Sequence, residues 1–177
     1  GKKPLLENIE IKKIAAEGKS IAYVDEKVLF VPNTVPGDIV DVQVTRKRKS
    51  FLEGFIVNVR KYSDIRTEPF CSHFGVCGGC KWQNLPYQLQ TEFKQQEIVD
   101  NLQRIGKVEL QNVSPIIGSP KTTYYRNKLE YTFCNKRFLT REEIANGQDI
   151  DRTPAVGFHV PGLFDKVIDI KKCYLQA

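Results

Sequence analysis

Short apolar segments separated by turn residues dominate the first third of the sequence. Val40, Val42 and Val44 alternate with polar residues, which is the period-two pattern of a β-strand with one face in a core. Neighbouring segments are rich in β-branched and aromatic residues, and Pro36-Gly37-Asp38 supplies a turn between two of them. The expected strands are residues 9–11, 22–24, 28–31, 39–44 and 55–59. Five strands in this length predict a small antiparallel, OB-like β-barrel.

The rest of the chain alternates between helical and extended patterns. A helix is expected from an N-cap at Asn84 to about Ile105, with Gly106 as its C-terminal cap. Strands are expected at residues 113–117, 126–133, 155–160 and 167–170, and residues 135–154 indicate a polar loop insertion with a short helix. The predicted fold class is mainly β with one or two helices (α+β). We expect a barrel over residues 1–61 and an α+β domain over residues 62–177.

The composition indicates a folded chain without a membrane helix and favours a negatively charged partner. Of its 177 residues 41% are hydrophobic and 27% charged, and no stretch approaches the roughly 20 apolar residues of a membrane helix. The net charge of +6 favours a polyanion, and residues 1–61 hold 12 Lys and Arg against 8 Asp and Glu, compared with 15 against 13 in residues 62–177. The chain begins at Gly1 and contains no Met, so we expect it to be part of a longer protein.

Three cysteines lie close together, and a fourth follows far downstream. Five residues separate Cys71 from Cys77, two separate Cys77 from Cys80, and Cys173 comes after the last predicted strand. A two-residue gap lets neighbouring sulfurs converge on one centre, and the Gly78-Gly79 pair allows the backbone to turn around it. The spacing therefore predicts a metal site that holds a zinc ion or an iron–sulfur cluster.

Other interpretations of the cysteines are weaker. A pair of disulfides would require an oxidising compartment, of which the sequence shows no sign. Three structural cysteines that are neighbours by coincidence would be expected in an apolar run, and these have charged or aromatic neighbours. We interpret Cys134 as a small half-buried residue, and His73 and His159 as ordinary structural or surface histidines.

Four consecutive cations occupy the turn between the last two strands of the predicted barrel. They are Arg46, Lys47, Arg48 and Lys49. Cations at a hairpin tip repel one another, so an anionic partner is the natural ligand, and phosphate contacts there would give affinity without sequence choice. The alternative is a hairpin that is basic only for solubility.

Several motifs together resemble a known family. They are Cys71-x5-Cys77-Gly-Gly-Cys80-Lys-Trp-Gln, Tyr87, Lys94, Tyr125-Arg126-Asn127-Lys128 with Glu130 and Phe133, Gly157-Phe158-His159, and Asp169 before Cys173. With the preceding barrel, this pattern resembles the RNA uracil-C5 methyltransferases of the RumA and TrmA type, and more closely those members with an N-terminal TRAM domain and an iron–sulfur cluster. The resemblance covers nearly the whole chain.

The resemblance implies specific roles. Cys71, Cys77, Cys80 and Cys173 match the family's four ligands of a 4Fe–4S cluster. Residues 1–61 match the RNA-binding TRAM barrel, and residues 62–177 match an incomplete central domain that helps to grip RNA, in which Arg126 and Lys128 are candidate contacts. The expected partner is RNA, with ribosomal RNA favoured and neither DNA nor a membrane expected, for a cytoplasmic monomer.

Catalysis in this family takes place in a C-terminal, Rossmann-like domain that binds S-adenosylmethionine. There a cysteine attacks the uracil ring so that its carbon can accept the methyl group. No glycine-rich turn that would bind this cofactor is found in residues 1–177, so we expect no catalytic or cofactor-binding residue in this chain, and no activity of the chain alone.

Two alternative functions remain at the sequence level. One is a non-enzymatic, zinc-stabilised RNA-binding module, because four thiolates also suit tetrahedral zinc. The other is a TRAM-containing radical methylthiotransferase. That family separates its three cysteines by three and then two residues and leaves one iron open, whereas here the first gap is five residues and a fourth cysteine is present.

Overall fold

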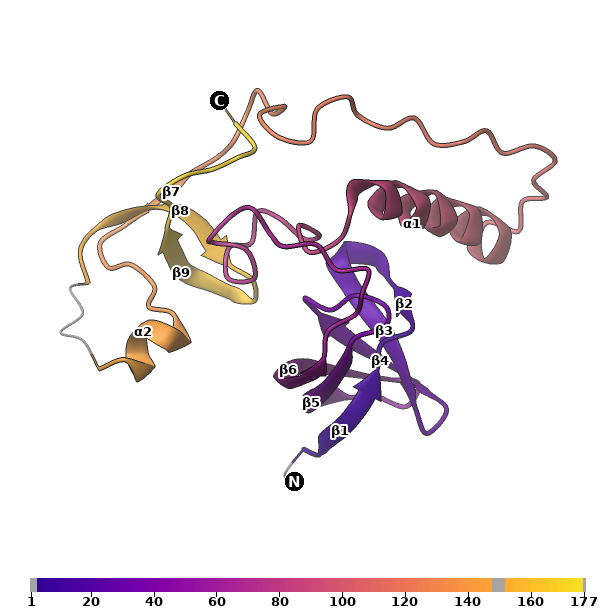
Figure 1. Ribbon diagram of the computed structural model, residues 1–177, viewed down its shortest axis with the longest axis horizontal. Coiled ribbons are helices and arrows are strands. Elements are labelled where there is room, and N and C mark those ends of the chain that lie inside the picture. The colour runs from indigo at the N-terminus through magenta and orange to yellow at the C-terminus, as the bar shows by residue number, and fades with distance from the viewer. Residues whose placement is uncertain (1–2, 148–151, 177) are drawn as a thin grey trace. The chain divides into compact units, whose positions relative to one another are not determined.

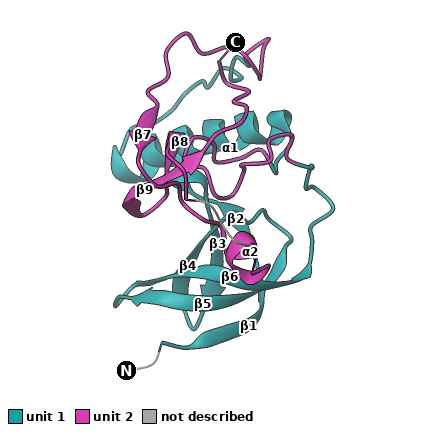
Figure 2. Ribbon diagram, turned by 90° about the vertical axis from the view of Figure 1, so that its left-hand side faces the viewer, with its two compact units in different colours: residues 1–68, 84–118 teal, residues 69–83, 119–177 magenta. Residues whose placement is uncertain are grey.

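The computed structural model describes residues 3–147 and 152–176, which fall into two compact units (Figure 2). Unit 1 contains residues 1–68 and 84–118, and unit 2 contains residues 69–83 and 119–177. The chain is mostly β, as the sequence predicts. The functional division at residue 61 stays a prediction. Within the described residues, no helix is long and apolar enough to cross a membrane.

Unit 1 is built on a curled, six-stranded sheet in the order β1-β5-β6-β4-β3-β2 (Figure 1). The strands are β1 Leu5–Glu10, β2 Lys13–Ile14, β3 Lys19–Val24, β4 Lys27–Pro32, β5 Ile39–Lys47 and β6 Phe51–Lys61. All five predicted strands are confirmed, although the segment at 9–11 is the end of a longer strand. The expectation of purely antiparallel pairing is wrong at one place, because β4 and β6 pair in parallel. The chain reverses twice between them, so the two neighbours run in the same direction.

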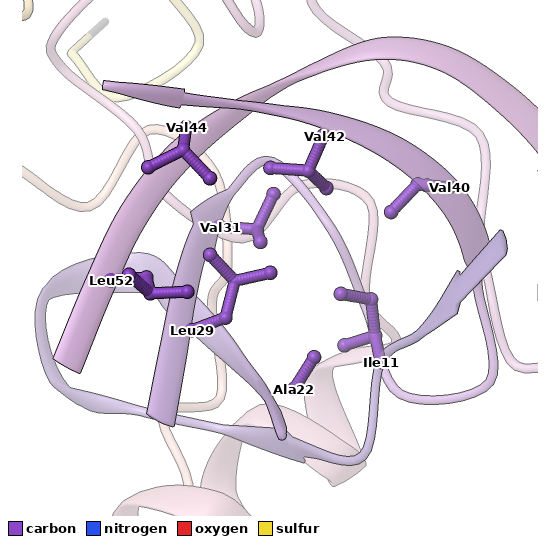
Figure 3. Packing of buried hydrophobic residues seen from close by; sticks show 8 residues of the cluster. All are labelled: Ile11, Ala22, Leu29, Val31, Val40, Val42, Val44 and Leu52. Carbon is purple, nitrogen blue, oxygen red and sulfur yellow. The ribbon is translucent and has the colours of Figure 1, made fainter. Parts of the chain in front are cut away.

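The core of unit 1 lies on the inner face of this sheet. Figure 3 shows its members pointing toward one another. They come from β3, β4, β5 and β6 and from the link between β1 and β2: Ile11, Ala22, Leu29, Val31, Val40, Val42, Val44 and Leu52. The three valines of β5 are buried as predicted, but the polar face is not fully exposed, because Asp41 between them is buried too. Full burial of one such side chain contributes about 1.5–3 kcal/mol, so this cluster is the main source of stability of the sheet.

A buried ion pair fixes the chain at one end of the sheet. Asp38 is fully buried and accepts hydrogen bonds from Arg66 Nε at 2.9 Å and from Arg66 Nη2 at 2.8 Å. Its carboxylate also accepts from the backbone N–H groups of Val35 at 2.8 Å and Ser63 at 2.9 Å. Asp38 thus joins the turn at residues 35–38 to the segment at residues 63–66, which is separate from it in sequence.

The long helix of unit 1 begins later than predicted. Helix α1 is Tyr87–Asp100 and continues as a π-helical turn, η2 Asn101–Ile105, with Gly106 as C-cap. Asn84 is not the N-cap: Pro86 takes that place, and Asn84 is buried. Its carbonyl accepts from the Thr67 N–H at 3.1 Å, so its backbone bonds to another segment instead of opening the helix.

The strand predicted at 113–117 is absent from the described chain. A helical side chain takes the place of a neighbouring strand there. Gln95 of α1 donates to the Ser114 carbonyl at 3.0 Å and accepts from the Ile116 N–H at 2.9 Å. These bonds satisfy extended backbone without a ladder.

Unit 2 contains a three-stranded antiparallel sheet in the order β7-β8-β9. Its strands are β7 Thr132–Cys134, β8 Ala155–Val160 and β9 Leu163–Asp169, so the two last predicted strands are confirmed. The strand predicted at 126–133 is reduced to its last residues. Upstream of them the backbone bonds to the C-terminal segment instead, with Tyr124 N–H donating to the Tyr174 carbonyl at 2.7 Å and Arg126 N–H to the Leu175 carbonyl at 2.9 Å.

The predicted insertion at 135–154 carries the expected short helix, α2 Arg141–Ala145. A capping box explains its position, because the Thr140 hydroxyl and the Glu143 carboxylate each accept a hydrogen bond from the other's backbone N–H. Residues 148–151 of the insertion lie outside the described part.

Candidate metal centre and nucleic-acid surfaces

The loop that carries Cys71, Cys77 and Cys80 is held by local hydrogen bonds. The Cys71 N–H donates to the Gln83 side chain at 3.1 Å, and the Cys77 N–H donates to the His73 carbonyl at 2.8 Å. Gly79 donates its N–H to Cys77 Sγ at 3.3 Å. This one backbone donor favours the charged form of the Cys77 sulfur.

The four predicted ligands surround one small cavity in unit 2. Cys71, Cys77, Cys80 and Cys173 all line it, together with apolar side chains that include Phe74, Phe158 and Ile170. The loop supplies three thiols, and the segment after β9 supplies the fourth. The folded chain therefore brings together residues that are about a hundred positions apart in sequence.

The thiols surround the cavity but do not yet form a ligand set. Among the described residues, no three His, Cys, Asp or Glu side chains converge closely enough to hold a metal ion. The cavity measures about 20 Å³, which is room for one water molecule. The donor set suits a metal that prefers sulfur, and the side chains would have to move to grip either a single ion or a cluster.

The thiols influence one another electrostatically. Burial raises the pKa of Cys77, the N–H of Gly79 opposes this, and Cys80, Cys71 and Cys173 raise the pKa further. Burial also raises the pKa of Cys80, against the hydrogen bond from Gln83, and Cys71 and Cys173 add to the rise. Such crowding favours protonated thiols unless a cation compensates for the charge.

The remaining cysteine and the two histidines are outside this set. Cys134 lies in β7 opposite Ala155 and does not line the cavity. His73 lines the cavity, but its Nε2 accepts the Lys171 N–H at 3.1 Å, which ties the loop to the segment before Cys173. His159 Nε2 lies 3.2 Å from the Thr132 hydroxyl. Both contacts agree with structural histidines, although no sequence pattern indicated the hydrogen bond between His73 and Lys171.

The predicted basic turn is present at the tip of the β5–β6 hairpin in unit 1. The Arg48 N–H closes it with a bond of 2.8 Å to the Phe51 carbonyl, and residues 46–50 are all exposed. Arg46 lies 3.4 Å from the Glu53 carboxylate, an exposed pair of little energetic value. The cations are therefore available to an anionic ligand.

Arg126 and Lys128 lie beside an open cleft in unit 2. The cleft has a volume of about 460 Å³, and Phe158, His159 and Gly79 also line it. Lys128 pairs with Glu130 at 2.8 Å, with both side chains mostly exposed. The sequence placed Arg126 and Lys128 on a regular strand but gave no sign of this cleft.

Comparisons with known proteins identify the relatives of this chain. Residues 7–57 match the family model described as the TRAM domain. An uncharacterized RNA methyltransferase of Bacteroides thetaiotaomicron is 56% identical over 163 residues, which is 92% of this chain and 36% of that protein. A 23S rRNA (uracil(1939)-C(5))-methyltransferase of Acidithiobacillus ferrooxidans is 42% identical over 118 residues, 67% of this chain and 27% of that protein.

By sequence, the chain belongs to this family of RNA methyltransferases. A member from Francisella tularensis subsp. novicida, also named as the 23S rRNA (uracil(1939)-C(5))-methyltransferase, is 34% identical over 169 residues and matches 91% of this chain. The chain spans only a little over a third of the length of such relatives: 36% of the Bacteroides thetaiotaomicron protein and 37% of an uncharacterized RNA methyltransferase of Porphyromonas gingivalis.

A solved structure shows the same fold. The tRNA (uracil-54, C5)-methyltransferase of Pyrococcus abyssi, crystallised with S-adenosyl-L-homocysteine, aligns with a TM-score of 0.52 at 22% identity. The alignment covers 94% of this chain and 32% of that protein. The aligned part of this chain therefore includes residues of both units.

Proposed function

We propose that this chain is the RNA-binding, metal-bearing part of an S-adenosylmethionine-dependent RNA methyltransferase that makes 5-methyluridine in 23S ribosomal RNA. The observation that carries the proposal is the similarity to relatives with that name along most of the chain, TRAM domain included. The same relatives support action in the cytoplasm, where ribosomal RNA is found, and we propose that the protein acts as a monomer.

Within this function, we assign the cysteine cavity to a 4Fe–4S cluster held by Cys71, Cys77, Cys80 and Cys173. Support comes from the shared cavity and from its apolar walls. A cluster bound by four thiolates has no open iron, so it would stabilise the fold instead of reacting with substrate. Its four cysteine ligands would then connect the loop at residues 71–80 to the segment after β9.

A single zinc ion is the second candidate for the same thiols. The observation that favours it is the donor set around the cavity, because four thiolates also suit tetrahedral zinc. With zinc the chain would be a zinc-stabilised RNA-binding module. The radical methylthiotransferase gains no support from the relatives.

Methyl transfer itself is assigned to another part of the protein. The described sheets contain one parallel pair, β4–β6, which forms part of the curled sheet, and no strand-helix-strand unit of the kind that binds S-adenosylmethionine. We propose that a further domain supplies the cofactor site and the nucleophile, and that residues 1–177 alone are inactive.

RNA binding by the hairpin is the first test. Replacing Arg46, Lys47, Arg48 and Lys49 with glutamine removes four exposed cations that would release counterions from phosphates. We expect the slope of log affinity against log salt to flatten by roughly three units, at about 0.7–0.9 per contact. Fluorescence anisotropy with labelled ribosomal RNA segments, from low to moderate salt, measures this slope.

A matched control removes cations elsewhere in the same unit. Lys12 pairs with Glu10, and Lys13 is exposed in β2, so changing both to glutamine tests mere loss of positive charge. If the control flattens the slope as much per cation as the hairpin variant does, the hairpin is not a specific contact surface. No measurable RNA affinity of the parent chain would refute the proposed function.

A further inference from the structure

The long helix of unit 1 has no buried residue. Helix α1 and the π-helical turn η2 that continues it span residues 87–105, and none of these residues is buried. Isolated helices of this length are marginal in water, because most of the stability of a helix in a protein comes from packing of its apolar side. The sheet of unit 1 buries no part of this helix, so the helix needs a further surface to pack against.

Three apolar side chains lie along one side of this helix. Leu102 follows Ile98 after four residues, and Ile105 follows Leu102 after three, which is the spacing that places side chains next to one another on a helix. Ile98 is 59% exposed and Ile105 is 78% exposed. Gln95 comes three residues before Ile98 and therefore lies on the same side.

The chain that follows the helix runs back along this side. The Val108 N–H donates to the Leu102 carbonyl at 2.9 Å, and the side chain of Gln95 bonds to the backbone at residues 114 and 116. This returning segment adds further exposed apolar side chains to those of the helix: Val108, Val113 and Ile117. The two parts together make one apolar surface, which we call the α1 surface.

The charges and side chains of the α1 surface favour a protein partner over RNA. Residues 94–109 hold three Lys and Arg and three Asp and Glu, so no excess of positive charge attracts phosphates. Residues 94–117 also contain no aromatic ring on which a base could stack. An exposed surface of aliphatic side chains without net charge suits another apolar protein surface.

The relatives of this chain contain much additional protein that could supply such a surface. The chain matches 36% and 37% of two of them, so nearly two thirds of each lies outside the matched region. The solved structure has the same proportion, since the alignment covers 94% of this chain and 32% of that protein. A domain outside residues 1–177 is therefore a candidate for the missing packing partner.

We propose that the catalytic domain packs on the α1 surface and buries Ile98, Leu102 and Ile105. The inference rests on the proposed function, which assigns the cofactor site to a further domain, and it extends that function by naming the surface on which this domain docks. Helix α1 belongs to the same unit as the TRAM sheet. Docking on this helix would therefore hold the RNA-binding sheet and the active site in a fixed arrangement.

Hydrogen exchange tests the docking and does not depend on activity. The backbone amides of residues 88–105 are compared in the 177-residue chain and in the full-length protein that contains it. We expect their protection to be higher in the full-length protein by about tenfold or more, because a helix packed on two sides opens less often than one with an exposed side. Equal protection in the two proteins would overturn the inference.

Ile105→Asp and Gln103→Asp are the matched variants. Each adds one carboxylate near the C-terminal end of the helix, so both have the same interaction with the helix dipole. Gln103 is exposed and two positions from Ile105, so it lies on a different side of the helix. In the 177-residue chain both variants should keep the far-ultraviolet circular dichroism of the parent, because both side chains are exposed there. In the full-length protein, Ile105→Asp should lower the protection of residues 88–105 by about tenfold and Gln103→Asp by less than about twofold.

Other occupants of the α1 surface would give different results. A second copy covers it if the 177-residue chain sediments as a dimer that Ile105→Asp dissociates. RNA covers it if a single-stranded RNA of mixed sequence raises the protection of residues 88–105 in the 177-residue chain. Either result, or equal effects of the two variants in the full-length protein, would overturn the inference. A full-length protein that protects the helix but methylates no uridine would refute the proposed function and leave the docking in place.

Discussion

Cys77→Ala is expected to strip the metal from unit 2 and to loosen the loop that carries three of the four thiols. The four thiols share one cavity, which joins the loop of Cys77 to the segment of Cys173 in addition to the hydrogen bond between Lys171 N–H and His73. Metal binding at such sites is coupled to folding, with apparent free energies for structural zinc of about 10–16 kcal/mol, so loss of one ligand has a large effect. Iron, sulfide and zinc analysis of anaerobically purified protein measures the metal, and hydrogen exchange of residues 71–83 measures the loop.

Cys134→Ala is the matched control. Cys134 is half-buried in β7 and does not line the cavity, so this variant should keep the metal content of the parent. The parent should be brown and absorb broadly near about 400 nm, as thiolate-bound clusters do. Stoichiometric zinc without sulfide would contradict the 4Fe–4S assignment and support the zinc-stabilised module instead. Full metal retention in Cys77→Ala would contradict the assigned ligand set.

Asp38→Ala is expected to destabilise unit 1 by about 3–5 kcal/mol. The change leaves the Arg66 guanidinium, whose side chain is only 20% exposed, without its carboxylate. It also leaves the N–H groups of Val35 and Ser63 without their acceptor. Because domains of this size are stable by only about 5–15 kcal/mol, the variant should lose a large share of its free energy of unfolding. Urea unfolding, followed by far-ultraviolet circular dichroism, gives the free energy.

An exposed pair in the same unit provides the comparison. Glu7 lies 3.3 Å from Arg60, and both side chains are about half exposed. Glu7→Ala should therefore cost less than about 1 kcal/mol. If Asp38→Ala and Glu7→Ala lower the free energy of unfolding equally, the Asp38–Arg66 pair does not hold the segments around it together.

Local patterns predict most of the strands, since alternation and turn residues act over short distances. The valines of β5 and the Pro36-Gly37-Asp38 turn both give the right structure. Long-range pairing could not be predicted in this way. The parallel contact of β4 with β6 and the bond between Asp38 and Arg66 depend on tertiary structure, and the pattern predicted a strand at 113–117 where Gln95 satisfies the backbone.

The candidate metal site also combines a part that local sequence predicts with a part that depends on the tertiary structure. The spacing of Cys71, Cys77 and Cys80 predicts a shared centre from sequence alone, whereas Cys173 is joined to them by the resemblance and by the fold. Whether the four bind metal remains a proposal.

The most direct measurement is methyl transfer from labelled S-adenosylmethionine to undermodified 23S ribosomal RNA, with the modified nucleoside identified by mass spectrometry. The account predicts 5-methyluridine from the full-length protein that contains this chain, and no transfer and no cofactor binding by residues 1–177 alone. A methylthio product, no uridine methylation by the full-length protein, or saturable cofactor binding by the 177-residue chain would contradict it.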